Sequence, residues 1–197
     1  MNSLFPPELR TASVVQRWSI VRTLNRDSVA EHSFFVTYYA VAIANLVKWR
    51  GPLDALTFAA LLHDADEFIA GDVVSPVKHG VFDNDKYEDF IEQQMNSRLP
   101  MMRARLRVIL DSEHGDTIKK IIKVADKVDA VIFLILEMRM GNSGISSLLT
   151  NAMENLYAAW LGLAGCDGVS IPDEMWNDQI YPAIQAHHKY GSIGIHD

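Results

Sequence analysis

The longest regular pattern in the sequence lies between Asp116 and Met140, where apolar residues recur at spacings of three and four. This spacing places them on one face of an α-helix, which has about 3.6 residues per turn. Similar patterns, punctuated by prolines, predict further helices over about 28–50, 52–64, 83–98, 100–111, 143–163 and 173–190. No stretch shows the sustained apolar and polar alternation of a strand bounded by turns. The sequence therefore predicts an all-α fold, a compact helical bundle.

Length and charge limit the classes of function. A chain of 197 residues fits one domain over 1–197, since a domain has about 100–200 residues. The net charge of −7 provides no basic surface for duplex nucleic acid, so a nucleotide partner should be a small molecule. The single cysteine, Cys166, excludes a disulfide framework and fits a reducing cytoplasm. We expect no signal peptide and no membrane span, because the N-terminus lacks a basic region and the apolar stretches are too short.

The segment from Ser28 to Glu31 has the pattern of a capping box, in which the serine and the glutamate cap the start of a helix. His32 follows directly and has apolar neighbours on its face of the predicted helix. The dipeptide His63-Asp64 ends a second, strongly apolar helix, and Asp126 lies within the apolar pattern of the longest one. Four potential metal ligands thus lie on three predicted helices.

Buried ionisable side chains are costly unless a charge or a metal ion satisfies them. Two imidazole nitrogens and two carboxylate oxygens suit a divalent cation and leave positions for water and substrate. A lone buried histidine, however, is more commonly a hydrogen-bonded core residue, and a lone helical aspartate is usually a cap or a solvated charge. The residues by themselves leave a metal site and a structural role both open.

Several short motifs occur in an order and spacing that resemble the HD-domain phosphohydrolases, and among them the bacterial 5′-deoxynucleotidase branch. They are Arg17-Trp18, Glu31-His32, His63-Asp64-Ala65-Asp66-Glu67, Gly71-Asp72, Ser75-Pro76-Val77-Lys78 and Ala125-Asp126. The resemblance covers most of 10–142. It implies an all-α fold with a divalent metal ion held by His32, His63, Asp64 and Asp126. Zn²⁺, Co²⁺ or Mn²⁺ would suit this donor set, and Mg²⁺ could accompany a triphosphate.

The resemblance also assigns catalytic roles to two carboxylates. Glu67 would orient the attacking water or take its proton, and Asp72 would lie beside the sugar or the water. Judged without the family, Glu67 is interpreted more simply as an exposed charge at a helix end.

The expected substrate-binding residues are cationic or aromatic. Arg17 offers a forked phosphate donor next to Trp18, a stacking surface, although a packing tryptophan beside a solvated arginine is the simpler alternative. Lys78 could pair with phosphate. Lys119, Lys123 and Lys127 form a stripe that we interpret as a solvated helix face. Lys119, at the start of this helix, is the candidate contact for a polyphosphate tail.

The segment from Arg17 to Thr23 resembles the phage dATP triphosphohydrolases of 2-aminoadenine genomes. By this resemblance Trp18 stacks on the base and Ile20 touches the purine edge. An apolar contact at adenine C2 would leave the 2-amino group of guanine without a partner, which costs about 1–3 kcal/mol. The favoured hypothesis is therefore a dATP triphosphohydrolase in a bacterial or phage-infected cytoplasm, assembled as a homo-oligomer, either a dimer or a hexamer.

The sequence leaves three alternatives to a dATP triphosphohydrolase open. One is a 5′-deoxynucleotidase that acts on dNMPs, and the departures at Ser19 and Asp66 from the bacterial pattern do not exclude it. Another is a non-catalytic nucleotide-binding module, which should have lost at least one ligand. A cyclic-nucleotide phosphodiesterase is the third, although such enzymes usually carry additional ligand histidines.

Overall fold

The computed structural model describes residues 7–72, 84–172 and 174–189, and these form helices without a strand. Only an isolated bridge, from Gln16 to Ser28, has β pairing within this part of the chain. The all-α prediction is confirmed. The helices are α1 (Glu8–Thr11), α2 (Val29–Leu46), α3 (Leu53–Leu61), α4 (Glu67–Ala70), α6 (Asn84–Arg98), α7 (Pro100–Leu110), α8 (Gly115–Arg139), α9 (Ser146–Ala164) and α10 (Tyr181–Lys189).

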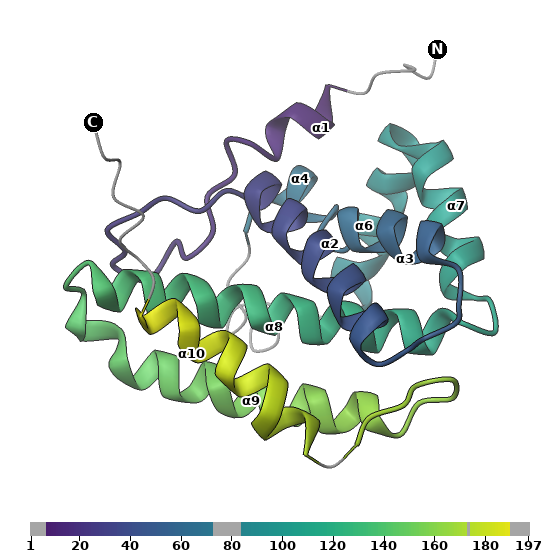
Figure 1. The fold of residues 1–197 in the computed structure, drawn as a ribbon. Coiled ribbons are helices and arrows are strands. Elements are labelled where there is room, and N and C mark those ends of the chain that lie inside the picture. Colours follow the sequence, from purple (N-terminus) through teal and green to yellow (C-terminus); the bar gives the residue numbers. More distant parts are fainter. Residues whose placement is uncertain (1–6, 73–83, 173, 190–197) are drawn as a thin grey trace, which may run out of the picture.

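Helix α8 runs through the middle of the molecule (Figure 1). Its most extensive contacts are with α9 and α2, and α10, α3 and α7 also pack on it. In Figure 1, α9 and α10 lie on one side of α8, whereas α2 and α3 lie on the other. The remaining short helices, α1 and α4, lie beyond α2 and contact one another.

Helix α8 is buried along most of its length, as its apolar spacing predicts. Ile118, Ile121, Val131 and Ile135 are fully buried, in a core that extends into α2, α3, α9 and α10. A second, smaller cluster packs α1, α4 and α6 together and includes Phe68 and other residues (Ala12, Val29, Leu62, Ala65, Met95 and Leu99). The turn that carries the His63-Asp64 motif follows Ala60 of the larger cluster and contributes Leu62 and Ala65 to the smaller one.

The start of α2 is formed as predicted, but its end is not. The Ser28 side chain accepts the Glu31 backbone N–H, and the Glu31 carboxylate accepts the Ser28 N–H. The helix ends at Leu46 rather than near residue 50, because the chain turns at Lys48, whose φ is 55°. This turn directs Trp49 into the core, where 7% of the residue stays exposed.

Within the described residues, none of the helices combines the length and the hydropathy that crossing a bilayer requires.

Candidate metal centre

The four predicted metal ligands come from three places in the fold. The capping box fixes the first turn of α2, which carries His32. Helix α3 ends at Leu61, so His63 and Asp64 lie in the turn that connects α3 with α4 rather than on a helix. Asp126 lies in the middle of α8. Packing of α2 and α3 on α8 brings these places together.

The side chains of these four residues converge on one point. His63 Nε2 lies 3.2 Å from His32 Nε2 and 3.1 Å from Asp64 Oδ2. His32 Nε2 lies 3.3 Å from Asp64 Oδ2 and 3.4 Å from Asp126 Oδ1. One ligand atom each of His32, His63 and Asp126 lie within 4.8 Å of one another, with Asp64 adjacent.

These separations fit a metal ion between the side chains. Nitrogen and oxygen ligands lie about 2.0–2.2 Å from Zn²⁺, so two ligands of a tetrahedral site are about 3.4 Å apart. All four distances lie between 3.1 and 3.4 Å, and three of them involve His32 Nε2, which carries at most one proton and cannot donate to every neighbour. The site can therefore hold a divalent ion with two imidazoles and two carboxylates.

Both histidines have a partner that sets the ring tautomer. His63 Nδ1 donates to the Ala60 carbonyl oxygen at 2.8 Å, and His32 Nδ1 lies 2.7 Å from Asp129 Oδ2. A proton on each Nδ1 leaves the Nε2 lone pair free for a metal ion. Sequence reasoning did not identify Asp129. Its only signal was a second aspartate, three residues after Asp126, within an apolar helical pattern.

The histidine and carboxylate side chains of the cluster shift one another's pKa values. Burial lowers the pKa of His32, but hydrogen bonds to Asp126, Asp129 and Asp64 raise it to about 10. Burial likewise opposes ionisation of Asp64 and Asp126, yet the neighbouring histidines hold both carboxyl pKa values below the ordinary range, with Lys127 contributing at Asp126. In the metal-free protein, a proton on His32 thus supplies the positive charge that the carboxylates require.

Glu67 lies in the first turn of α4, three residues after Asp64. Its Oε2 atom is buried with no hydrogen-bond partner among the described residues. Burial, together with the charges of Asp64, Asp72 and Asp66, raises the pKa of Glu67 to about 8. A buried oxygen without a partner fits a position that faces a water molecule or a cation. The interpretation of Glu67 as an exposed charge is wrong, because the residue is half-buried.

Arg17 lies at the edge of the cluster but is bound to carboxylates. Its guanidinium donates to Asp27 Oδ2 at 2.9 Å and lies 3.6 Å from Asp129 Oδ2 and 4.0 Å from Asp126 Oδ1. Trp18 Nε1 donates to the same Asp27 oxygen at 3.2 Å. Burial raises the pKa of Asp27, which Arg17 partly offsets. Asp27, which sequence reasoning missed, thus connects Arg17 and Trp18.

The other expected substrate residues lie at different distances from the cluster. Ile20 is 71% exposed, and Lys119 pairs with Asp116 in the first turn of α8. Lys78 lies outside the described residues. Lys127 differs from the solvated face that we expected: its ammonium lies 2.7 Å from Asp126 Oδ2, the oxygen that does not face His32.

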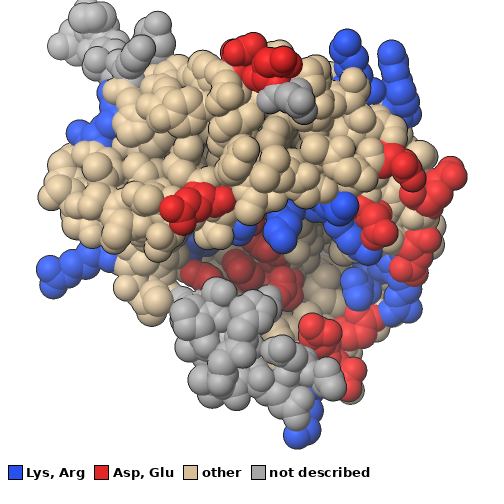
Figure 2. Space-filling view, turned by 90° about the horizontal axis from the view of Figure 1, so that it is seen from below, with Lys and Arg blue, Asp and Glu red and all other residues tan. Residues whose placement is uncertain are grey.

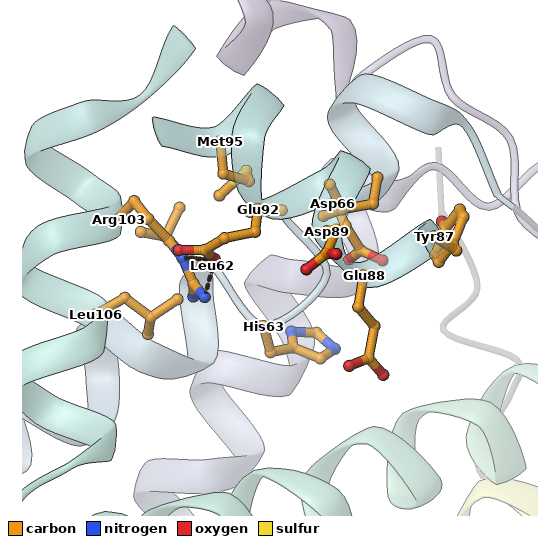
Figure 3. A pocket seen from close by; sticks show the side chains of 12 residues that line it. Leu62, His63, Asp66, Tyr87, Glu88, Asp89, Glu92, Met95, Arg103 and Leu106 are labelled. Carbon is orange, nitrogen blue, oxygen red and sulfur yellow. Dashed lines mark hydrogen bonds and ion pairs between the residues drawn. The ribbon is translucent and has the colours of Figure 1, made fainter. Parts of the chain in front are cut away.

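The molecular surface has a hollow in which acidic side chains gather, with Lys and Arg side chains along its rim (Figure 2). A cavity of about 470 Å³ lies next to His63, between its turn and helices α6 and α7 (Figure 3). The lining contains four acidic side chains and Arg103, which is ion-paired with Glu92 (the acidic residues are Asp66, Glu88, Asp89 and Glu92). Among the described residues, the lining of this cavity therefore carries a negative net charge.

Comparison with known proteins places these features in a family. A family model described as 5′-deoxynucleotidase YfbR-like matches residues 5–161. A 5′-deoxynucleotidase of Photorhabdus temperata is 31% identical over 151 residues, which cover 72% of this chain and 77% of that protein.

Solved structures share the fold. An HD-domain phosphohydrolase of Listeria innocua is 24% identical, with a TM-score of 0.66, over 91% of this chain and 87% of its own. The HD phosphohydrolase DatZ of cyanophage S-2L, solved with dA and one catalytic Zn²⁺ ion, is 19% identical, with a TM-score of 0.66. That match covers 96% of this chain and 99% of DatZ.

Proposed function

Because this chain belongs to the YfbR-like family of HD-domain 5′-deoxynucleotidases and is a metal-dependent phosphohydrolase, we propose that it hydrolyses dATP to deoxyadenosine and triphosphate. The observation that carries the phosphohydrolase chemistry is the convergence of two imidazole nitrogens and two carboxylates beside the unpartnered Glu67 oxygen.

The reaction joins a water oxygen to the α-phosphorus and breaks the bond from that phosphorus to the 5′-oxygen. His32, His63, Asp64 and Asp126 would hold a divalent ion, which would supply Lewis acidity and lower the pKa of water. A cation at the site would favour the ionised form of Glu67, which then accepts a proton from the attacking water through its buried oxygen, and Asp72 orients that water. Arg17 exchanges part of its carboxylate pairing for the α-phosphate, and the departing 5′-oxygen takes up a proton.

Two residues support the choice of adenine. The half-exposed Trp18 offers indole surface for stacking with a base. Ile20 follows two residues later and is 71% exposed, so burial in the core does not explain an isoleucine there. An exposed apolar side chain beside a stacking surface fits contact with the C2 edge of adenine.

The triphosphate is favoured by the charges on α8. Lys123 and Lys119 lie three and seven residues before Asp126, which places them on the same side of the helix. Both are exposed. They offer positive charge beyond the α-phosphate, and neither lines the acidic cavity next to His63.

A 5′-deoxynucleotidase that releases phosphate from dNMPs is the second candidate. It is favoured by the Photorhabdus relative, which bears that name. A binding module without catalysis fits less well, because the four ligands and Glu67 are all present.

Product analysis separates these candidates. The metal-loaded protein is incubated with dAMP, dATP, dGTP and ATP, and phosphate and triphosphate are quantified. We expect triphosphate from dATP, with slower turnover of dGTP and ATP. Phosphate from dAMP with dATP left intact would establish the nucleotidase instead, and metal binding without any product would establish the binding module.

The Ile20→Ala variant tests the base contact. Removing the side chain relieves its clash with a 2-amino group, so the ratio of kcat/KM for dGTP to that for dATP should rise about 10- to 100-fold. Val14→Ala is the matched control, because Val14 is also 71% exposed. An unchanged ratio in Ile20→Ala would refute the contact between Ile20 and adenine.

A further inference from the structure

Trp18 is held in an unusual conformation at the start of an irregular loop. Its φ is 62°, a left-handed value that is strained for a non-glycine residue and persists only where the surroundings hold it. The indole stacks on Phe133 of α8, with ring centroids 5.3 Å apart and an interplanar angle of 8°. Phe133 thus covers part of the indole and fixes the direction of its plane.

The loop after Trp18 is tied to the end of α8 by a buried carboxylate. Glu137 is fully buried, and its two oxygens accept the backbone N–H groups of Leu24 at 2.6 Å and Asn25 at 2.7 Å. Asn142 donates to Glu137 at 2.9 Å and to the Arg22 carbonyl oxygen at 2.8 Å. These bonds hold the backbone over 22–25, although Leu24 and Asn25 are themselves exposed.

Burying the Glu137 carboxylate costs free energy unless a cation or several hydrogen-bond donors compensate its charge. No Lys or Arg side chain pairs with it in the part of the chain that the structure describes, and a buried carboxylate normally requires a cation or several donors. Burial opposes its ionisation, but the Leu24, Asn142 and Asn25 hydrogen bonds hold the Glu137 pKa below its ordinary value. The charge of Glu137 is therefore balanced by two backbone donors of the loop and by the Asn142 amide.

Phe133 and Glu137 also share a helix face with the metal site. They lie seven and eleven residues after Asp126, close to two and three turns of α8. The rise from Asp126 to Phe133 is about 10 Å, a span similar to that of one nucleoside monophosphate. Helix α8 thus sets the distance between the metal ligands and the indole.

We propose that Glu137 and Phe133 are positioning residues for nucleobase binding: Glu137 anchors the loop over 18–25, Phe133 supports the indole, and together they hold Trp18 where the base stacks. This inference rests on the proposed function, in which Trp18 contacts the base. It predicts that their loss weakens nucleotide binding and leaves the metal site intact.

The main test is Glu137→Gln, in which one carboxylate oxygen becomes an amide group that cannot accept a backbone N–H. We expect KM for dATP and dAMP to rise about tenfold, as for loss of one hydrogen bond to a charged group. The kcat and the Kd for Zn²⁺ alone should stay within about twofold. Glu154→Gln, at an exposed position on α9, controls for the change of charge.

A double-mutant cycle with Trp18→Ala shows whether Glu137 acts through the indole. In the Trp18→Ala background, Glu137→Gln should add less than about twofold to KM, because residues that act through one contact are not additive. An equal KM increase in both backgrounds, or a loss of Zn²⁺ affinity, would overturn the inference.

If Glu137→Gln does not fold, Phe133→Leu provides a second test of the inference. This variant should fold, because Phe133 is only half-buried and leucine is also apolar. Loss of the ring contact should raise KM about 2- to 10-fold, again only when Trp18 is present. If Trp18→Ala leaves KM unchanged, the proposed base contact itself is wrong. If Trp18→Ala raises KM but neither Glu137→Gln nor Phe133→Leu does, only this inference is wrong.

Discussion

His32 uses both nitrogens of its fully buried ring. Nδ1 faces Asp129, whereas Nε2 faces Asp64 and Asp126. Three carboxylates around one imidazole need a positive charge, which either a proton on the ring or a metal ion can supply. Proton binding and metal binding therefore compete at this residue.

This competition predicts a pH-dependent metal affinity. Hydrogen bonds to the carboxylates outweigh burial and raise the pKa of His32 to about 10, so the ring is protonated at neutral pH without metal. Each Zn²⁺ ion bound at pH 7 should release about one proton from His32, and the affinity should rise about tenfold per pH unit. Titration calorimetry in buffers of different ionisation enthalpy measures the proton count.

Glu67→Gln is the control for that titration, because Glu67 is the neighbouring group with a pKa of about 8. The proton release from His32 should persist in this variant. Binding heats that do not depend on the buffer would contradict the competition.

Glu67 itself is expected to act in turnover. Glu67→Gln should lower kcat by about 10²–10⁴, the usual contribution of a general base, with Zn²⁺ still bound. Steady-state kinetics and elemental analysis of the same preparation measure both quantities. Glu113→Gln, at an exposed position before α8, serves as the control. If the variant retains more than about a tenth of the wild-type kcat, Glu67 has no catalytic role.

At the scale of the element, the start of α2 positions His32, a predicted metal ligand. The capping box closes the first turn at Ser28 and Glu31, and His32 is the next residue. A helix that begins one residue earlier or later would rotate His32 by about 100° away from the cluster. The cap therefore contributes to the site as well as to the stability of the helix.

Removal of this cap should reduce stability. The Ser28 hydroxyl donates to the Glu31 carboxylate at 2.6 Å and accepts its backbone N–H at 3.3 Å. Ser28→Ala should lower the free energy of unfolding by about 0.5–2 kcal/mol, measured by urea denaturation. Ser147→Ala, at an exposed position in α9, should change it by less than about 0.5 kcal/mol. Equal values for the two variants would show that the cap contributes nothing.

At the scale of the whole molecule, the candidate metal centre connects segments that are distant in sequence. Its ligands come from α2, from the turn between α3 and α4, and from α8. A bound ion thus links both hydrophobic clusters, since Leu62 and Ala65 beside the ligand turn belong to the smaller one.

Metal binding should therefore stabilise the fold. A ligand at 100 times its Kd adds about 2.7 kcal/mol, which raises the Tm of a chain of this size by about 5–10 °C. Thermal unfolding with Zn²⁺ and with a chelator measures this shift. His63→Ala should abolish it, whereas His188→Ala, at an exposed position on α10, should retain it. A full shift in His63→Ala would exclude the centre.

Local sequence patterns predicted most of the helices and the residues proposed as metal ligands. Periodicity and capping act within a few residues, so α8 and the first turn of α2 could be predicted from local spacing. The four ligands were recognised through motifs, and the structure places them together. That the chain is one domain, and that it forms oligomers, stay predictions, as do the individual roles of the site residues.

The side chains that support the site could be identified only from the packing of the helices. Asp129 contacts His32 across 97 positions, and Glu137 contacts Leu24 across 113. A carboxylate in an apolar helix looks the same in sequence whether it faces solvent, a histidine or a loop. Its partner depends on how α2 and the loop after Trp18 pack on α8. Packing joins residues far apart in the chain, and local spacing carries no information about such contacts.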